Sequence, residues 1–275
     1  MSHKILCSVS VLTYNSQEHL AECLASITDF AEVCVVDGGS TDATLTIARQ
    51  YGAKIFSQFD NPQDAGRIKN FGAMRERSMA FNTLDWILVL DSDEFLSPEA
   101  VREIREALRQ YQTTPWVAFS LEYKTIVEGQ KIEYAFHIPR YIRLFNKHSG
   151  IMWKKDKPVH EKLFVPKEIK VIALQHPFWG YVPSAKACRK KDAYYLSLAW
   201  SRMQQGVERG KRLEVLRAAG KNLLRAVWIA LKSVVVYLRY GFQKSLPPHH
   251  VWRYVRYHLV ISYFRIKQFF FPTIL

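Results

Sequence analysis

Three carboxylates stand close together in the stretch Asp91-Ser92-Asp93-Glu94, directly after the apolar run Ile87 to Leu90. Four apolar residues in a row are typical of a strand buried on both faces of a sheet, and ligands of α/β sheets bind at the carboxyl ends of such strands. Asp91 and Asp93 are two residues apart, so both can converge on one hard cation and, through it, on a diphosphate. The stretch by itself fits a local turn equally well, because Asp and Ser also favour the turns that end strands.

A second acidic strand end is predicted at Asp37, which follows the apolar run Ala31 to Val36 as Asp91 follows Ile87 to Leu90. The loop after it, Gly38-Gly39-Ser40-Thr41-Asp42, has two glycines for tight backbone and polar residues that can cap the next helix. Asp37 could be only a turn residue, but its position repeats that of Asp91. We therefore expect both acids to border one crevice that handles a nucleotide.

The elements that must position these acids alternate through the first half of the chain. Apolar spacing predicts strands at residues 5–12, 31–36, 54–59 and 87–90, and helices at 17–28, 43–51, 65–81 and 99–111. This alternation with short connections predicts an α/β fold built on a parallel, doubly wound sheet. Residues 116–126 and 140–145 have strand patterns with no helix signal between them, which favours antiparallel strands added to the parallel half.

Basic residues on the predicted helix at 65–81 could reach the crevice. The helix carries Arg67, Lys69, Arg75 and Arg77, and any of them that faces the crevice would counter phosphate charge. Such residues more often form a solvated helix face, and we assign Arg75 and Arg77 to that role.

Composition divides the chain into two parts. The 275 residues have a net charge of +14, but residues 186–275 hold 18 Lys and Arg against three Asp and Glu, so the first 185 residues are close to neutral. The four cysteines have no paired spacing, which predicts reduced core thiols. The N-terminus enters a strand without the apolar core of a signal peptide, and we expect a protein of the cytosolic side.

The basic part, residues 186–275, is predicted to form helices at 186–205, 213–240 and 251–271. On a helix of about 100° per residue, five basic residues of the second helix fall in one stripe among apolar residues, and the apolar stretches are shorter than the about 20 residues of a membrane span. Mixed aromatics and cations in the third helix add to the pattern, and we predict amphipathic helices on an anionic membrane surface. Packing on the first 185 residues or a homo-oligomer interface are the alternatives, whereas no nucleic-acid motif is present. The basic stripe consists of Arg217, Lys221, Arg225, Lys232 and Arg239.

Taken together, the motifs resemble the inverting glycosyltransferases of family 2. The matching segments are Leu12-Thr13-Tyr14-Asn15, Val35 to Asp42, Lys69-Asn70 and the DXD-type run Leu90 to Glu94. Residues 140–145 and Val159-His160-Glu161 extend the resemblance toward the branch with lipopolysaccharide core β-1,4-glucosyltransferases. The resemblance covers residues 5–163 and implies the GT-A fold, a Rossmann-like mixed sheet with helices on both faces. In this chain residues 1–185 would be the catalytic domain and residues 186–275 the membrane-associating region.

The resemblance also implies a role for individual residues. Glu161 would be the catalytic base and His160 its neighbour, although many family 2 members carry Glu-Asp where this chain has His-Glu. Asp93 would bind Mg²⁺ or Mn²⁺ directly, with Asp91 on the ribose and metal side. The residues implied to hold the donor are Thr13, Asn15 and Asp37 around base and ribose, Lys69, Asn70, Asp91 and Ser92 beside the nucleotide, and Arg140 and Arg143 at the diphosphate or acceptor.

The predicted function is transfer of a sugar, with inversion, from a nucleotide-sugar donor, UDP-linked by preference, to a lipid-linked or lipopolysaccharide-core saccharide at the cytosolic face of the inner membrane. A divalent cation would neutralise the leaving diphosphate, and one carboxylate would deprotonate the acceptor hydroxyl. A nucleotidyltransferase of similar architecture, or a non-catalytic membrane-binding scaffold, remain alternatives to this function.

Overall fold

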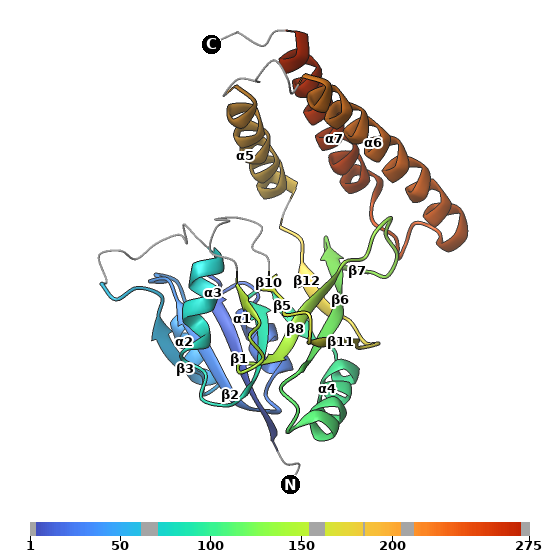
Figure 1. The fold of residues 1–275 in the computed structure, drawn as a ribbon. Coiled ribbons are helices and arrows are strands. Elements are labelled where there is room, and N and C mark those ends of the chain that lie inside the picture. The colour runs from blue at the N-terminus through green and yellow to red at the C-terminus, as the bar shows by residue number, and fades with distance from the viewer. Residues whose placement is uncertain (1–3, 62–70, 154–162, 184, 205–211, 271–275) are drawn as a thin grey trace. The chain divides into compact units, whose positions relative to one another are not determined.

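The structure is a computed structural model that describes residues 4–61, 71–153, 163–183, 185–204 and 212–270 (Figure 1). Its contacts divide the chain into two compact units. The sheet unit comprises Met1–Lys124 and Pro139–Tyr181, and the helical unit comprises Thr125–Ile138 and Val182–Leu275. The segment Thr125–Ile138 therefore packs with the C-terminal helices, although it lies in the middle of the predicted strand region.

A mixed sheet forms the framework of the sheet unit, in the strand order β3-β2-β1-β4-β8-β6-β12-β5 (Figure 1). Strands β1 to β4 pair in parallel, and β8 then runs antiparallel to both β4 and β6. The α/β fold class is thus confirmed, with antiparallel strands extending a parallel half. The strands in chain order are β1 Ile5–Thr13, β2 Phe30–Asp37, β3 Lys54–Ser57, β4 Trp86–Asp91, β5 Glu94–Leu96, β6 Val117–Val127, β7 Gln130–Ile132, β8 Arg140–Asn146, β9 Met152–Trp153, β10 Leu163–Phe164, β11 Lys170–Ala173 and β12 Phe178–Tyr181.

Within its described residues the sheet unit has four helices: α1 Leu20–Ser26, α2 Thr44–Gln50, α3 Phe71–Met79 and α4 Pro98–Tyr111. Helix α4 begins as predicted, because the Ser97 hydroxyl accepts a hydrogen bond from the Ala100 amide at 3.2 Å and Pro98 occupies the first turn. Helix α1 is shorter than predicted, since Gln17 binds the neighbouring loop instead: its amide donates to Asp42 and its side chain accepts from Ala43. All four cysteines are buried and free, which confirms the prediction of reduced core thiols.

The parallel register brings the two acidic strand ends to one edge of the sheet. Leu12 of β1 is opposite Val36 of β2 on one side and Asp91 of β4 on the other. One residue further, Thr13 is opposite Asp37. Strand β1 therefore lies between the two carboxylates that the sequence singled out, and these stand at the carboxyl ends of the two strands that flank β1.

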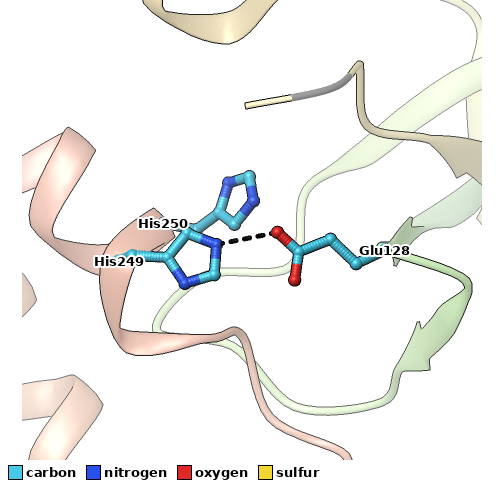
Figure 2. Close-up of side chains that lie close together, drawn as sticks. All are labelled: Glu128, His249 and His250. Carbon is cyan, nitrogen blue, oxygen red and sulfur yellow. Dashed lines mark hydrogen bonds and ion pairs between the residues drawn. The ribbon is translucent and has the colours of Figure 1, made fainter. Parts of the chain in front are cut away.

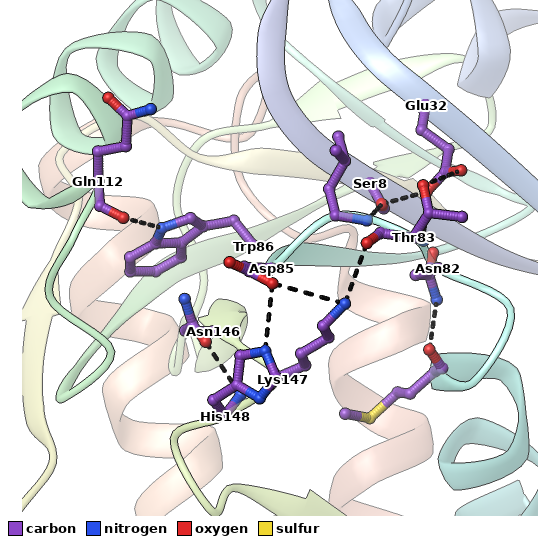
Figure 3. Close-up of polar contacts among 12 residues, drawn as sticks. Ser8, Glu32, Asn82, Thr83, Asp85, Trp86, Gln112, Asn146, Lys147 and His148 are labelled. Atoms are coloured by element: carbon purple, nitrogen blue, oxygen red, sulfur yellow. Dashed lines mark hydrogen bonds and ion pairs between the residues drawn. The ribbon is translucent and has the colours of Figure 1, made fainter.

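At the opposite edge, the buried carboxylate of Glu32 fastens the start of β4 (Figure 3). Ser8 donates its hydroxyl to this carboxylate, Lys54 pairs with it at 2.7 Å, and Thr83 donates both its amide and its hydroxyl at 2.8 Å. Lys147, which follows β8, donates in turn to the Thr83 carbonyl at 3.0 Å. These bonds hold the segment that leads into β4 in place, and they therefore help to set the position of Asp91 at the other end of the strand.

Replacing Glu32 with Ala should destabilise the protein by about 2 to 3 kcal/mol at pH 7, because buried donors of Ser8 and Thr83 lose their partner. Burial alone would raise the pKa of Glu32, but the bonds from Lys54, Ser8 and Thr83 outweigh it and lower that pKa to about 2. The stabilisation is therefore complete above the unfolded-state pKa of about 4.5 and disappears as the pH falls toward 2.

Urea unfolding midpoints at pH 7 and at decreasing pH measure this effect. The difference between wild type and Glu32→Ala should shrink below about pH 4.5. Glu18→Ala, which removes an exposed carboxylate, is the matched control and should leave the midpoint unchanged. Equal midpoints for wild type and Glu32→Ala at pH 7 would contradict the assignment.

The helical unit contains α5 Ala185–Gln204, α6 Arg212–Tyr240 and α7 Pro248–Phe270. Helices α6 and α7 lie side by side and antiparallel (Figure 1), since Ser262 donates to the Ala219 carbonyl at 3.0 Å, His258 contacts Asn222 at 2.9 Å, and the Tyr237 hydroxyl donates to a carbonyl before α7 at 2.7 Å. Among the described helices, none is both long enough and apolar enough to cross a membrane.

Candidate active site

The buried carboxylate of Asp37 organises the loop after β2. Its Oδ1 accepts hydrogen bonds from the hydroxyls of Thr13 at 2.8 Å and Ser40 at 2.6 Å, and its Oδ2 accepts from the amides of Gly39 and Ser40, both at 2.8 Å. Four donors fill the acceptor sites of a carboxylate. Asp37 thus holds the loop in one shape, and Thr13 is bound to it across the strand pair.

The loops after β1 and β2 are joined by Asn15. Its side-chain oxygen accepts from the Thr41 amide at 2.8 Å, and its own amide donates to the Ser40 hydroxyl at 2.8 Å. Asn15 has a φ of 49°, in the left-handed region that Asn tolerates better than most residues. Three residues predicted from the sequence, Thr13, Asn15 and Asp37, therefore belong to one hydrogen-bonded border at the carboxyl ends of β1 and β2.

Gln58 is part of the same border and was missed by the sequence analysis. This buried residue follows β3, and its side-chain amide donates to the carbonyls of Thr13 at 3.0 Å and Val36 at 2.9 Å. An isolated Gln after a short strand gives no pattern that could be read from one sequence. The structural role of Gln58, which is to link the ends of β1 and β2, is evident only from the three-dimensional arrangement of β1, β2 and β3.

Asp91 is held between two arginines. Arg75 of α3 binds its Oδ1 at 2.5 Å, and Arg143 of β8 approaches its Oδ2 at 3.9 Å. The Arg75 side chain is 5% exposed, so the predicted solvated position of Arg75 is wrong. Helix α3 turns Arg75 toward the sheet, where the carboxylate compensates for the loss of hydration, whereas Arg77, two residues on, pairs with the exposed Asp60.

Glu94 adds a further carboxylate to this cluster, and it is buried. It accepts from the Asp91 amide at 2.8 Å and from Arg143 at 2.7 Å. Complete burial raises the pKa of Glu94, and repulsion from Asp91 and Asp93 adds to that effect, while the charge of Arg143 opposes it. The sequence analysis placed Glu94 in the acidic cluster but assigned it no role; here it joins β4, β5 and β8.

Ser92 and Asp93 form the turn between β4 and β5. The Ser92 hydroxyl donates to the hydroxyl of Ser16 at 2.9 Å, which links this turn to the loop after β1, and the Asp93 carbonyl accepts from the Tyr181 amide at 3.0 Å. Asp91 is paired with Arg75 and Arg143, and Asp93 offers a second carboxylate two residues further along the turn. A Mg²⁺ or Mn²⁺ ion fits the oxygen-rich donor set of Asp91 and Asp93.

Several predicted residues lie elsewhere or cannot be placed. Arg140 donates to the carbonyls of Ser120 at 3.1 Å and Leu174 at 2.9 Å, and pairs with Glu122 at 3.3 Å, so its described contacts hold strands together. Its role toward a diphosphate stays a prediction. The predicted residues Lys69, Asn70, His160 and Glu161 lie outside the described part of the chain.

Residues 8–191 match the family described as Glycosyl transferase family 2, and the chain belongs to that family. It is 35% identical over 173 residues to a TPR repeat-containing protein of Synechococcus elongatus, a match that covers 62% of this chain and only 38% of that protein. An uncharacterized glycosyltransferase of Rickettsia typhi is 25% identical over 255 residues, 86% of this chain and 79% of the relative. The structure of S. aureus TarS residues 1–349 in complex with UDP-GlcNAc has 15% identity and a TM-score of 0.47, over 94% of this chain and 90% of TarS.

Family membership confirms that the chain is a glycosyltransferase of GT-A fold. The resemblance seen in the sequence was therefore correct at the level of the family and the fold.

Replacing Arg75 with Ala should lower the free energy of unfolding by about 1 to 3 kcal/mol, because the half-buried carboxylate of Asp91 would lose its buried partner and would share Arg143 with the buried Glu94. Arg75→Lys keeps the charge but not the planar guanidinium and should recover part of the loss. Thermal or urea unfolding measures the effect. Arg77→Ala, on the same helix, is the control and should leave the midpoint unchanged; an equally small effect of Arg75→Ala would show that Asp91 needs no buried partner.

Proposed function

We propose that this glycosyltransferase transfers a sugar from a UDP-linked donor, with inversion, to a lipid-linked or lipopolysaccharide-core saccharide at the cytosolic face of a membrane. The observation that supports donor binding most strongly is that β1, β2 and β4 end at the same edge of the sheet. At this edge the border of Thr13, Asn15 and Asp37 lies on one side of β1, and the turn from Asp91 to Asp93 lies on the other side. The two sides are joined by the bond between Ser16 and Ser92.

The two sides of this edge suit the two parts of a nucleotide sugar. The border of Thr13, Asn15 and Asp37 offers hydroxyl, amide and carboxylate groups for the base and ribose. Asp93, with Asp91 beside it, would hold a divalent cation, which would supply positive charge to the diphosphate as it leaves. Arg143, which pairs with Glu94 in this cluster, stands on the same side and supports the orientation of Asp91.

Asp93→Ala should weaken metal-dependent binding of UDP by at least tenfold, because the directly coordinating carboxylate is lost. Calorimetric titration with UDP, with and without MgCl₂ or MnCl₂, measures this, and a screen of nucleotide sugars by thermal stabilisation identifies the donor. Asp85→Ala removes an exposed carboxylate just before β4 and serves as control. Unchanged metal-dependent binding in Asp93→Ala would remove Asp93 from the metal site, and release of pyrophosphate in place of UDP would identify a nucleotidyltransferase.

For the base we propose Glu161, with His160 as its neighbour. Both lie outside the described residues, and the proposal rests on their sequence order and on the resemblance that the motifs show. Inversion in one displacement needs a single carboxylate that accepts the proton of the acceptor hydroxyl as it attacks the anomeric carbon. Glu161 is of the type that this step requires.

Glu161→Gln should keep donor binding and lower the rate of transfer by 10²-fold or more, since the amide has nearly the shape of the carboxylate but cannot accept the proton. Initial rates of sugar transfer, measured beside the dissociation constant for UDP, separate the two effects. Glu168→Gln, at an exposed position, is the matched control. Transfer at the wild-type rate in Glu161→Gln would assign the base to another residue.

The outer surface of α6 supports membrane association. One side of this helix packs in the helical unit through Val215, Ala219, Ala226, Ile229 and Val236. On a helix of about 100° per residue, the opposite side carries a continuous apolar stripe, and the basic stripe lies between the two. The apolar stripe is exposed and consists of Leu213, Leu216, Leu223, Leu224, Val227, Leu231, Val234, Val235 and Leu238, and the exposed basic stripe consists of Arg217, Lys221, Arg225, Lys232 and Arg239.

A helix with a buried side, an exposed apolar side and a basic side matches what an anionic lipid interface selects. Burial of the apolar stripe in lipid supplies the hydrophobic contribution, and each basic residue near an anionic surface adds about 1 kcal/mol. A surface of this kind would keep the enzyme beside a membrane-borne acceptor. A second copy of the chain could cover the same stripe, and the experiment below distinguishes the two partners.

Substituting Leu224, Leu231 and Leu238 together with Gln should reduce binding to phosphatidylglycerol vesicles by more than tenfold, since these side chains are 63 to 82% exposed and lie along one line of α6. Vesicle co-sedimentation measures it, with neutral phosphatidylcholine vesicles and added salt testing the charge contribution.

The control for this variant places the same substitution at Leu6, Met152 and Val171, three exposed apolar residues of the sheet unit. Vesicle binding by the α6 variant equal to wild type would place the membrane surface elsewhere. A wild-type dimer that becomes a monomer in the α6 variant, without vesicle binding by either protein, would assign the stripe to self-association.

A further inference from the structure

Three side chains of the types that ligate metals meet in the helical unit, far from the carboxylate cluster in the chain. Glu128 comes from the loop between β6 and β7, and His249 and His250 come from the first turn of α7 (Figure 2). His249 Nε2 lies 3.2 Å from Glu128 Oε1, and one ligand atom from each of the three residues lies within 4.8 Å of the others. The proposed glycosyltransferase chemistry uses none of them.

The backbone at Glu128 is unusual for a glutamate. Glu128 and Gly129 form a two-residue hairpin loop with φ values of 52° and 79°, the left-handed pair that favours Asn and Gly. A glutamate in this conformation is strained relative to those residues, and strain of this kind is retained where the surroundings or a function require it. The contact that its carboxylate makes is with His249.

The neighbours of these residues hold them in place. Val127, beside Glu128, and Val251, beside His250, are buried in one apolar cluster together with Ile229 and Leu246. The hairpin loop and the first turn of α7 are therefore both anchored next to their polar side chains. Ligands on anchored elements need little ordering when an ion binds.

The group combines one buried imidazole with two more accessible side chains. His250 is buried among the elements that meet here. Glu128 and His249 have side chains that are 62 and 52% exposed, so an ion can reach the group from solvent.

We propose that Glu128, His249 and His250 bind a divalent transition metal ion, Zn²⁺ by preference, which fastens the β6–β7 loop to the start of α7. Two imidazoles and one carboxylate are a usual zinc ligand set, with water in the fourth position. Zinc bonds of about 2.0 to 2.2 Å set neighbouring tetrahedral ligand atoms about 3.3 Å apart. Glu128 and His249 already have that separation, and His250 needs only a small closing movement.

Arg253 makes a contact that ligation through His250 Nδ1 would change. Its Nη1 donates to His250 Nδ1 at 3.1 Å, while its Nε and Nη2 pair with Asp192 at 2.7 and 3.0 Å. Loss of one such hydrogen bond costs roughly tenfold in an equilibrium constant, whereas zinc–ligand bonds contribute several orders of magnitude. Arg253 would keep Asp192, which balances its positive charge beside the ion.

The test is calorimetric titration of the tag-free full chain with ZnCl₂, in excess MgCl₂ so that the oxygen-rich site at Asp93 is saturated. We expect one Zn²⁺ per chain with micromolar or tighter affinity, and at least tenfold weaker binding in Glu128→Gly and in His249→Asn. Glu128→Gly is the decisive variant, because glycine suits the positive φ and the metal-free protein should be at least as stable as wild type. Zn²⁺ should raise the thermal midpoint of wild type but not that of Glu128→Gly.

His148→Asn is the matched control, since His148 is an exposed histidine of the sheet unit that also pairs with a carboxylate, Asp85. Its Zn²⁺ affinity should equal that of wild type. Absence of a Zn²⁺ equivalent in wild type, or wild-type affinity in both Glu128→Gly and His249→Asn, would overturn the proposal and leave Glu128 and His249 as a simple ion pair.

Discussion

Compensation of the carboxylates at the end of β4 is the constraint on which the sheet unit depends. A sharp strand turn brings the half-buried Asp91 and the buried Glu94 together, and carboxylates that lose water need cations and hydrogen-bond donors. Arg75 comes from α3, just before β4 in the chain, and Arg143 comes from the more distant β8, so the charge balance links three elements. The antiparallel strand β8 beside β4 is therefore part of the site and not only an extension of the sheet.

Strand β4 is fixed at both ends, by different polar contacts at each end. At its amino end, Glu32 gathers donors from Ser8, Lys54 and Thr83, and at its carboxyl end the arginines hold Asp91. Between these ends Ile87, Leu88 and Leu90 are fully buried. Because β4 is buried along its length and held by polar contacts at both ends, the Ser92-Asp93 turn has a defined position. It lies beside the loops that Asp37 and Asn15 hold together. Such preorganisation is what binding of a flexible nucleotide sugar requires.

In the helical unit the main feature is α6, whose sides differ in chemistry: one is buried, one is apolar and exposed, and one is basic. The buried side of α6 packs with α7, and this packing leaves the apolar stripe outward. An exposed apolar surface of this extent is the kind that marks interaction sites, and it is the basis of the proposed membrane association. The group of Glu128, His249 and His250 lies where the β6–β7 hairpin loop contacts the start of α7. The helical unit therefore includes a hairpin as well as its helices.

From the sequence alone, the α/β alternation, the order of the first strands and the acidic strand ends at Asp37 and Asp91 could be predicted, because hydrophobic period and turn chemistry are local properties of the chain. The family resemblance followed from the same residues. Gln58, the buried position of Arg75 and the meeting of Glu128 with His249 could not be predicted, since each depends on segments separated by tens to more than a hundred residues. Residue type shows that a charge exists, and only the tertiary structure decides which opposite charge it meets and whether water reaches both.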